Sequence, residues 1–251
     1  MAKIGVFDTD AAALQKRVAS HDKFGTRELN DWIFENLKFS PNDHALDLGC
    51  GFGKQSMLML REGCNVVAVD ASSESIDFLN KTATDEYLSE KLVTIKSEFD
   101  NLVLPDIEFD LAVSSYAFYY SIDYLKTLSL VHEKLKKGGA LFICGPAYKN
   151  NQAMKVLLKK AGVVFGEGSA PFMEDEGPVL FKQVFGNVQK TYFENEVVFP
   201  NADEVWKYWS SHNMFDVNIE KSFKENIESH FNASDSFVTT KVAVGLLAIK
   251  H

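Results

Sequence analysis

Apolar side chains follow two alternating patterns along the chain up to Asn150. Short, nearly continuous apolar runs of the kind that form buried parallel strands occur five times. Between them, apolar residues recur every three or four positions, which is typical of amphipathic helices. The predicted strands are 44–48, 65–70, 92–96, 109–114 and 140–145, and the predicted helices are 24–37, 54–61, a segment capped by Ser72 or Ser73, and a segment from Ser121 to Leu135. This alternation indicates a parallel sheet with helices on both faces.

The rest of the chain has a weaker pattern. It predicts a helix at 152–161, an irregular glycine-rich connection at 163–177, a strand at 188–199, a helix opened by a capping box of Asn201 and Glu204, and a last strand at 236–250. No repeat, low-complexity tract or linker marks a second domain. We therefore expect one domain over 1–251, with a core at about 42–147, an N-terminal helix at about 20–38 and further elements at about 148–251.

Three glycines, Gly49, Gly51 and Gly53, connect the first predicted strand to the helix that begins at Lys54. Such a turn bends tightly and lets a ligand approach the main chain, and the helix start offers unpaired N–H groups. A dinucleotide fingerprint would place its third glycine where Lys54 stands. An acidic residue, Asp47, precedes the first glycine by two positions.

A second acid, Asp70, ends the second predicted strand, 21 residues after Gly49. A carboxylate there can accept hydrogen bonds from both hydroxyls of a ribose. Nicotinamide-binding folds place an acid similarly, so Asp70 does not discriminate between cofactors. A helix-capping role is the alternative interpretation.

The stretch from Asp47 to Gly53 resembles motif I of the class I S-adenosylmethionine (SAM)-dependent methyltransferases. Further features follow in the family's order: Asp70, then Glu98-Phe99 at the end of the third strand, then Phe109–Val113, then Leu135–Gly139. The resemblance covers roughly Leu46–Gly145 and points to the small-molecule, type 11/12-like members. It implies a Rossmann-like α/β fold with a seven-stranded, mostly parallel sheet whose last strand is antiparallel.

The resemblance also implies SAM as cofactor and S-adenosylhomocysteine as product. The acidic side chain of Glu98 would accept from the adenine amine, Phe99 would flank the base, and Asp70 would hold the ribose. The cofactor-binding residues implied in this way are Asp47, Gly49, Cys50, Gly51, Gly53, Asp70, Ala71, Glu98, Phe99 and Ser114.

Subfamily markers are mostly absent. The run Ser114-Ser115-Tyr116-Ala117 replaces the Asn/Asp-Pro-Pro-aromatic run of DNA and glutamine methyltransferases. Ser114 stands where catechol-type enzymes have an acidic metal ligand, and the loop lacks the glutamate pair of arginine methyltransferases. We expect metal-independent, in-line transfer to an oxygen or nitrogen of a small molecule.

Candidate catalytic residues are Tyr119 and Tyr120, which follow the fourth strand, and His21, which precedes a helix that often forms a lid in relatives. Packing in the wall of the site is the alternative for both tyrosines. His212, at the end of a tryptophan-rich helix, is better explained by the helix dipole, and His132 by a structural role.

Composition and charge limit the classes of molecule that the protein is expected to bind. The formal net charge of −9 and the pI near 5.2 disfavour broad contact with nucleic acid. Neither a signal peptide nor a membrane span is evident, and the three scattered cysteines indicate a reduced, cytoplasmic protein without structural zinc. The expected partner is a small acceptor with an apolar or aromatic part, and a homodimer is left open.

Two other functions compete with methyl transfer. A nicotinamide oxidoreductase shares the strand, glycine loop, helix and distal acid. A non-catalytic partner subunit would keep the fold without the chemistry, although the intact glycines, Asp70 and Glu98 argue against this.

Overall fold

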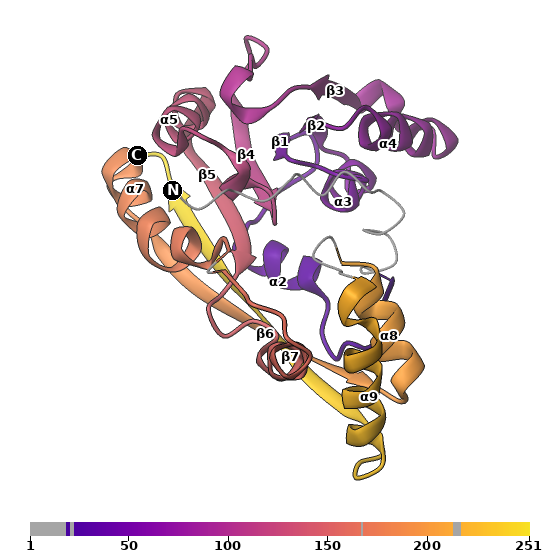
Figure 1. Cartoon of the computed structure of the whole chain (residues 1–251). Coiled ribbons are helices and arrows are strands. Elements are labelled where there is room, and N and C mark those ends of the chain that lie inside the picture. The colour runs from indigo at the N-terminus through magenta and orange to yellow at the C-terminus, as the bar shows by residue number, and fades with distance from the viewer. Residues whose placement is uncertain (1–18, 21–22, 167, 213–216) are drawn as a thin grey trace. The chain divides into compact units, whose positions relative to one another are not determined.

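The computed structural model describes residues 19–20, 23–166, 168–212 and 217–251 (Figure 1). Its described residues form two compact units. The sheet unit comprises Leu29–Ala147, Ser169–Tyr192 and Val244–His251. The helical unit comprises Tyr148–Gly168, Phe193–Ala243 and the described residues up to Glu28. The prediction of one domain stays a prediction, and each unit is described by itself.

The regular elements lie close to the predicted positions. In the sheet unit they are α2 (Leu29–Asn36), β1 (His44–Leu48), α3 (Lys54–Arg61), β2 (Asn65–Asp70), α4 (Ser73–Asp85), β3 (Leu92–Lys96), β4 (Phe109–Ser115), α5 (Tyr124–Lys134), β5 (Leu135–Pro146) and α7 (Gly177–Phe185). In the helical unit they are α6 (Gln152–Lys160), α8 (Ala202–Ser210) and α9 (Glu220–Phe231). Two long strands, β6 (Gln189–Phe199) and β7 (Phe237–Ile249), contribute residues to both units.

The strands form one seven-stranded sheet in the order β3-β2-β1-β4-β5-β7-β6. Strands β1 to β5 pair in parallel, with Ala45 opposite Val66 on one side and Leu111 on the other. The last strand is antiparallel, since Gly138 and Gly139 at the start of β5 exchange backbone hydrogen bonds with Lys250 just beyond the end of β7. The predicted Rossmann-like α/β sheet is confirmed.

The central strands are buried on both faces, as a parallel sheet covered by helices requires. Four of the five residues of β1 are buried, and so are the four middle residues of β2. From β1 the chain continues through α3 and α4 to β2 and β3 on one side of β1, and from β4 it continues through α5 to β5 on the other side. Because the strand order reverses between β1 and β4, the carboxyl ends of these strands are where a ligand is expected.

Three predicted boundaries are wrong. The helix predicted at 24–37 is α2, which begins at Leu29, since Gly25 forms an isolated antiparallel bridge with Val197. The helix after β4 is capped by Asp123, whose carboxylate accepts from the Lys126 N–H, while Ser121 is buried against Thr127. The fifth strand begins at Leu135 instead of residue 140, because the glycine turn is a bulge within β5.

The pattern also missed two helices. The segment read as irregular up to residue 177 contains a π-helical turn, Phe172–Glu176, that runs directly into α7. Helix α7 packs against α5, with the ring centroids of Phe185 and His132 4.9 Å apart (Figure 1). This contact gives His132 a structural role. Helix α9 was missed because its buried positions are few, Phe223 and Ile227.

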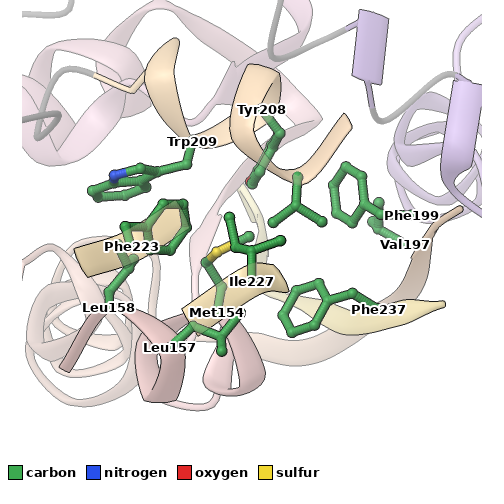
Figure 2. Close-up of a cluster of buried hydrophobic side chains, with 11 residues drawn as sticks. Met154, Leu157, Leu158, Val197, Phe199, Tyr208, Trp209, Phe223, Ile227 and Phe237 are labelled. Atoms are coloured by element: carbon green, nitrogen blue, oxygen red, sulfur yellow. The ribbon is translucent and has the colours of Figure 1, made fainter. Parts of the chain in front are cut away.

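The helical unit has a hydrophobic core of its own. Figure 2 shows apolar side chains from its helices and strands converging on one cluster. Its buried members are Met154, Leu157, Leu158, Val197, Phe199, Val205, Tyr208, Trp209, Phe223, Ile227 and Phe237. The predicted cap of α8 is present, because the Asn201 side chain accepts from the Glu204 N–H.

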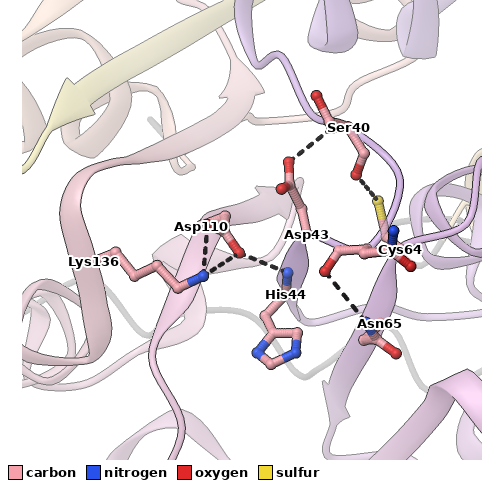
Figure 3. A network of polar contacts seen from close by, with 8 residues as sticks. Ser40, Asp43, His44, Cys64, Asn65, Asp110 and Lys136 are labelled. Atoms are coloured by element: carbon pink, nitrogen blue, oxygen red, sulfur yellow. Dashed lines mark hydrogen bonds and ion pairs between the residues drawn. The ribbon is translucent and has the colours of Figure 1, made fainter.

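A polar network joins β1 to β4 and β5 at the amino ends of these strands (Figure 3). The Asp110 carboxylate accepts from the His44 N–H at 2.8 Å and from the Lys136 ammonium at 2.7 and 2.8 Å. Partial burial raises the pKa of Asp110, but the hydrogen bonds from Lys136 and His44 outweigh it and hold the pKa below its ordinary value. This end of the sheet has a fully partnered carboxylate.

Candidate active site

The three glycines of the loop between β1 and α3 serve two different purposes. All three have positive φ, at 72° for Gly49, 51° for Gly51 and 80° for Gly53. A Cβ on Gly49 would lie 2.2 Å from that of Ala117, and one on Gly53 would lie 2.4 Å from Leu79 of α4. A Cβ on Gly51 would meet nothing within 4 Å. Two glycines therefore allow close packing inside the protein, and Gly51 faces open space.

Backbone hydrogen bonds hold the loop against the end of β2. The N–H groups of Gly49 and Cys50 both donate to the Val69 carbonyl, at 2.8 and 2.9 Å. The Asp70 carboxylate accepts from the Gly51 N–H and, with its other oxygen, from the Ser72 N–H, both at 2.8 Å. Asp70 thus positions the loop at its open glycine, and each carboxylate oxygen retains a further lone pair for a ligand.

Asp47 lies beneath this loop and is completely buried. One carboxylate oxygen accepts from the Ser56 hydroxyl at 2.6 Å, and the other has no hydrogen-bond partner among the described residues. Burial raises the pKa of Asp47 to about 7, although the hydrogen bonds from Ser56 lower it. A buried carboxyl oxygen without a partner is costly, so its presence under a ligand-facing loop is a functional signal.

Two other predicted cofactor residues are turned into the protein. Ser114 is fully buried and donates from its hydroxyl to the Leu48 carbonyl at 2.7 Å. This bond ties β4 to the last residue of β1, directly before Gly49. Cys50 is buried as well, and desolvation raises the pKa of its thiol well above the ordinary value. Both side chains support the loop, and direct cofactor contact by either stays a prediction.

Glu98 and Phe99 follow β3 as predicted. Glu98 is exposed, and the Phe99 ring reaches within 3.4 Å of the position a Cβ would take on Gly49. The rings of Phe99 and Phe118 have centroids 5.9 Å apart. The exposed Ala71 follows Asp70 on the neighbouring strand end. The predicted adenine and ribose residues therefore lie at the ends of adjacent strands.

Tyr119 and Tyr120 follow β4 in a short 3-10 turn, with ring centroids 4.9 Å apart. Burial raises the pKa of Tyr119 well above its ordinary value, and a hydrogen bond with Ser169 only partly opposes this. A Cβ on Gly145 would lie 2.8 Å from the Tyr119 ring and 3.0 Å from Met173. The same loop holds Tyr116 at a φ of 57°, which is unusual for a bulky residue. Such strain is typical of functional loops.

Three further residues are not tested at this site by the structure. His21 lies outside the described residues. Phe24 belongs to the helical unit, where its ring lies 5.4 Å from that of Phe199. His212, also in the helical unit, stacks on Trp209 with centroids 5.3 Å apart. The catalytic role of His21 stays a prediction.

Sequence reasoning missed the residues that support the loop from outside it. Ser56 donates a hydrogen bond to Asp47, and Ser169 forms one with Tyr119. Leu79 packs against Gly53, and Ala117 packs against Gly49. Ser56 was the easiest of these four residues to predict from the sequence, since a hydroxyl in the first turn of α3 can reach back beneath the loop. The other three come from separate elements, and no local spacing connects them to their partners.

The residues of the glycine loop fit a SAM-type cofactor. The open face at Gly51, the Asp70 carboxylate and the unpartnered Asp47 oxygen provide space, an acceptor for hydroxyl groups and a second acceptor. The described residues contain no group of three His, Cys, Asp or Glu side chains arranged to hold a metal. A groove of about 370 Å³ along α2 and α3 contains none of the predicted site residues.

Comparison with known proteins agrees with this geometry. A family model described as a methyltransferase domain matches residues 46–143, which run from β1 to β5 and include the whole glycine loop. This match covers less than half of the chain, and it shows that the segment from β1 to β5 is similar to class I SAM-dependent methyltransferases. The matched segment includes the strand ends that carry the candidate site, and the match supports SAM as the cofactor.

Individual relatives extend this picture. The chain is 31% identical over 117 residues to a probable fatty acid methyltransferase of Mycobacterium tuberculosis, covering 43% of this chain and 26% of the relative. It is 25% identical to a sterol 24-C-methyltransferase of Aspergillus fumigatus, covering 76% of this chain and 49% of the relative. The chain spans a quarter to a half of these curated relatives.

Solved structures share the fold over more of the chain. The YcgJ protein of Bacillus subtilis matches with a TM-score of 0.61 and 15% identity, covering 88% of this chain and 97% of the solved chain. At this identity the match concerns the fold alone.

Proposed function

We propose that the chain is a SAM-dependent methyltransferase that methylates an oxygen or nitrogen of a small molecule with an apolar or aromatic part. The observation that carries the proposal is the open face of Gly51, held in place by Asp70 above the unpartnered oxygen of Asp47. The family supports methyl transfer in general. The acceptor atom is the part that we add.

SAM supplies, when bound, a methyl group on a positively charged sulfur that is already activated for transfer. The protein must then bind, orient and exclude water. Orientation of two reactants can contribute roughly 7–11 kcal/mol of the barrier. The rigid loop, tied to β2 by Val69 and Asp70 and to β4 by Ser114, is suited to this task.

The tyrosines suit orientation better than proton removal. Because burial raises the pKa of Tyr119, its hydroxyl stays protonated at neutral pH and can donate a hydrogen bond to an acceptor molecule. It cannot serve as a base there. We infer that the acceptor brings its own lone pair, as an amine or an ionised oxygen does, and that transfer needs no metal.

Transfer to carbon is the second candidate. The similarity to a sterol 24-C-methyltransferase favours it, as the name of that relative refers to a carbon acceptor. An acceptor assay that includes amines, phenols and unsaturated lipids, followed by mass determination of the methylated atom, separates the two candidates.

The expected partners follow from charge and composition. A net charge of −9 supports a small-molecule acceptor over nucleic acid. Among the described residues, no helix combines the length and the apolarity that crossing a bilayer requires. We place the protein in the cytoplasm and leave a homodimer open.

Calorimetric titration tests the cofactor. S-Adenosylhomocysteine and NAD⁺ are titrated separately into the protein, and transfer of a labelled methyl from SAM is measured afterwards. The proposal expects saturable binding of S-adenosylhomocysteine and none of NAD⁺. Binding of NAD⁺ alone would favour an oxidoreductase, and binding without any transfer would favour a non-catalytic subunit.

A further inference from the structure

A cluster of polar and basic side chains lies in the helical unit, apart from the residues assigned to SAM. We call it the lysine cluster and define it as Asn151, Lys155, Tyr208 and Lys241. The Lys241 ammonium and the Asn151 amide both donate to the hydroxyl of the buried Tyr208, at 3.0 and 3.3 Å. The Lys155 ammonium donates to the carbonyl of Tyr148, seven residues earlier in the chain, at 3.4 Å.

Hydrogen bonds between β7 and the two residues that precede α6 hold the cluster in position. The Asn151 N–H donates to the Thr240 carbonyl at 2.9 Å, and the Val242 N–H donates to the Asn150 side chain at 3.1 Å. Asn151 itself has a φ of 57°, and its side chain makes no cap for α6. Instead its amide oxygen accepts from Thr239 at 3.4 Å, which directs the NH₂ group at Tyr208. Polar groups held this rigidly resemble a built binding site.

The charges in the cluster are unbalanced. Several lysines of the helical unit pair with glutamates, as Lys207 does with Glu204 and Lys224 with Glu220. Among the described residues, neither Lys155 nor Lys241 has a carboxylate within 4.0 Å. Burial lowers the pKa of Lys155, and the charges of Lys159 and Lys241 lower it further. Two half-buried cations that repel each other require a compensating anion or a cost in stability.

We propose that the lysine cluster binds the phosphate or carboxylate group of a small organic anion. The Lys155 and Lys241 ammonium groups and the Asn151 amide are donors that match the acceptor-rich oxygens of such groups. In a protein with a net charge of −9, two neighbouring lysines without a carboxylate partner among the described residues are also the feature that an anionic ligand needs. The Tyr148 ring, 42% exposed beside Lys155, offers apolar contact to the body of the ligand. The site lies within the helical unit and does not depend on methyl transfer.

Matched variants of α6 provide the test. Lys155→Met removes a cluster cation and keeps the apolar stem, whereas Lys160→Met removes the same charge from an exposed position on the same helix. Inorganic phosphate, acetate and phenyl phosphate are titrated into the intact chain by calorimetry. We expect saturable binding of at least one probe, weakened about tenfold by Lys155→Met and less than twofold by Lys160→Met.

The probes separate the sources of the anion. Tighter binding of phenyl phosphate than of inorganic phosphate indicates an organic ligand, and equal affinity indicates that a free anion suffices and contradicts the organic part of the proposal. Equal weakening by the two variants, or no saturable binding of any probe, overturns the site itself. A separate readout guards against a merely structural effect: by NMR, a saturating anion should raise the pKa of Lys155 in the wild-type chain, and an unchanged pKa contradicts binding at this cluster.

Discussion

The two ends of the paired strands β1 and β4 carry buried or partly buried carboxylates in opposite conditions. At the amino end, Asp110 accepts from a lysine and a backbone N–H, and its pKa is lowered (Figure 3). At the carboxyl end, Asp47 has one hydroxyl partner and one oxygen without a described partner, and burial raises its pKa to about 7. The fully partnered end stabilises the fold, and the incompletely partnered end lies beneath the loop that faces the ligand.

The largest expected effect concerns Asp47. Its pKa is raised in the folded state, so the unfolded chain loses this proton first, and stability falls as the pH rises from about 4 to about 7. A difference of about 3 units corresponds to ~4 kcal/mol at most. Asp47→Asn should remove this pH dependence and leave the protein more stable than wild type above pH 7. Urea unfolding at several pH values measures it, and an unchanged slope would show that Asp47 is ionised in the folded protein.

Asp70 comes next. Asp70→Ala removes an acceptor of charge-assisted hydrogen bonds worth ~1.5–3 kcal/mol, so binding of S-adenosylhomocysteine should weaken roughly 10–150-fold. Asp70→Asn keeps the shape and part of the hydrogen bonding, and should fall between wild type and alanine. Calorimetry provides the affinities. A change below about threefold for alanine would remove Asp70 from the cofactor site.

Asp110 should respond in the opposite direction to Asp47. Its pKa is lowered in the folded state, so its contribution to stability is present above about pH 4 and is lost as the pH falls through the folded value. The pair with Lys136 is partly exposed, so Asp110→Asn should cost only about 1 kcal/mol at pH 7. Cofactor affinity should not change. A large loss of cofactor binding with intact stability would break the contrast between the two strand ends.

The smallest effects are expected at the tyrosines. Tyr119→Phe should lower kcat/KM severalfold by removing a hydrogen-bond donor, with no shift of the pH profile, because the hydroxyl does not ionise near neutral pH. Tyr120→Phe and His21→Ala complete the series. If all three variants stay within about twofold of wild type, these groups neither orient the acceptor nor transfer protons.

The sequence predicted what depends on local pattern. The strand–loop–helix around Gly49–Gly53 and the acid at the end of β2 were found because their spacing is short and their residue types are restrictive. The supports of the loop were not found. Leu79 and Ala117 contact the glycines from other elements. Whether the Ser114 hydroxyl can donate to the Leu48 carbonyl depends on the register of β4 against β1. Such contacts are set by tertiary packing.

The prediction for the chain beyond residue 150 was less accurate for a related reason. Helix α7 lies after a segment rich in glycine and proline, and its start is a π-helical turn that no simple period describes. The long strands β6 and β7 were recognisable by their alternation, but their division between two compact units was not.

The central claim is that SAM binds at the open face of Gly51, and a matched pair of glycine variants tests it most directly. Gly51 and Gly186 both have positive φ and open space at the Cβ position, and Gly186 lies at the end of α7. Valine at either position carries the same backbone penalty, of roughly 1–2 kcal/mol. Calorimetric titration with S-adenosylhomocysteine should show that Gly51→Val abolishes binding while Gly186→Val binds as wild type does. Unchanged affinity in Gly51→Val, or equal loss in both folded variants, would contradict the account.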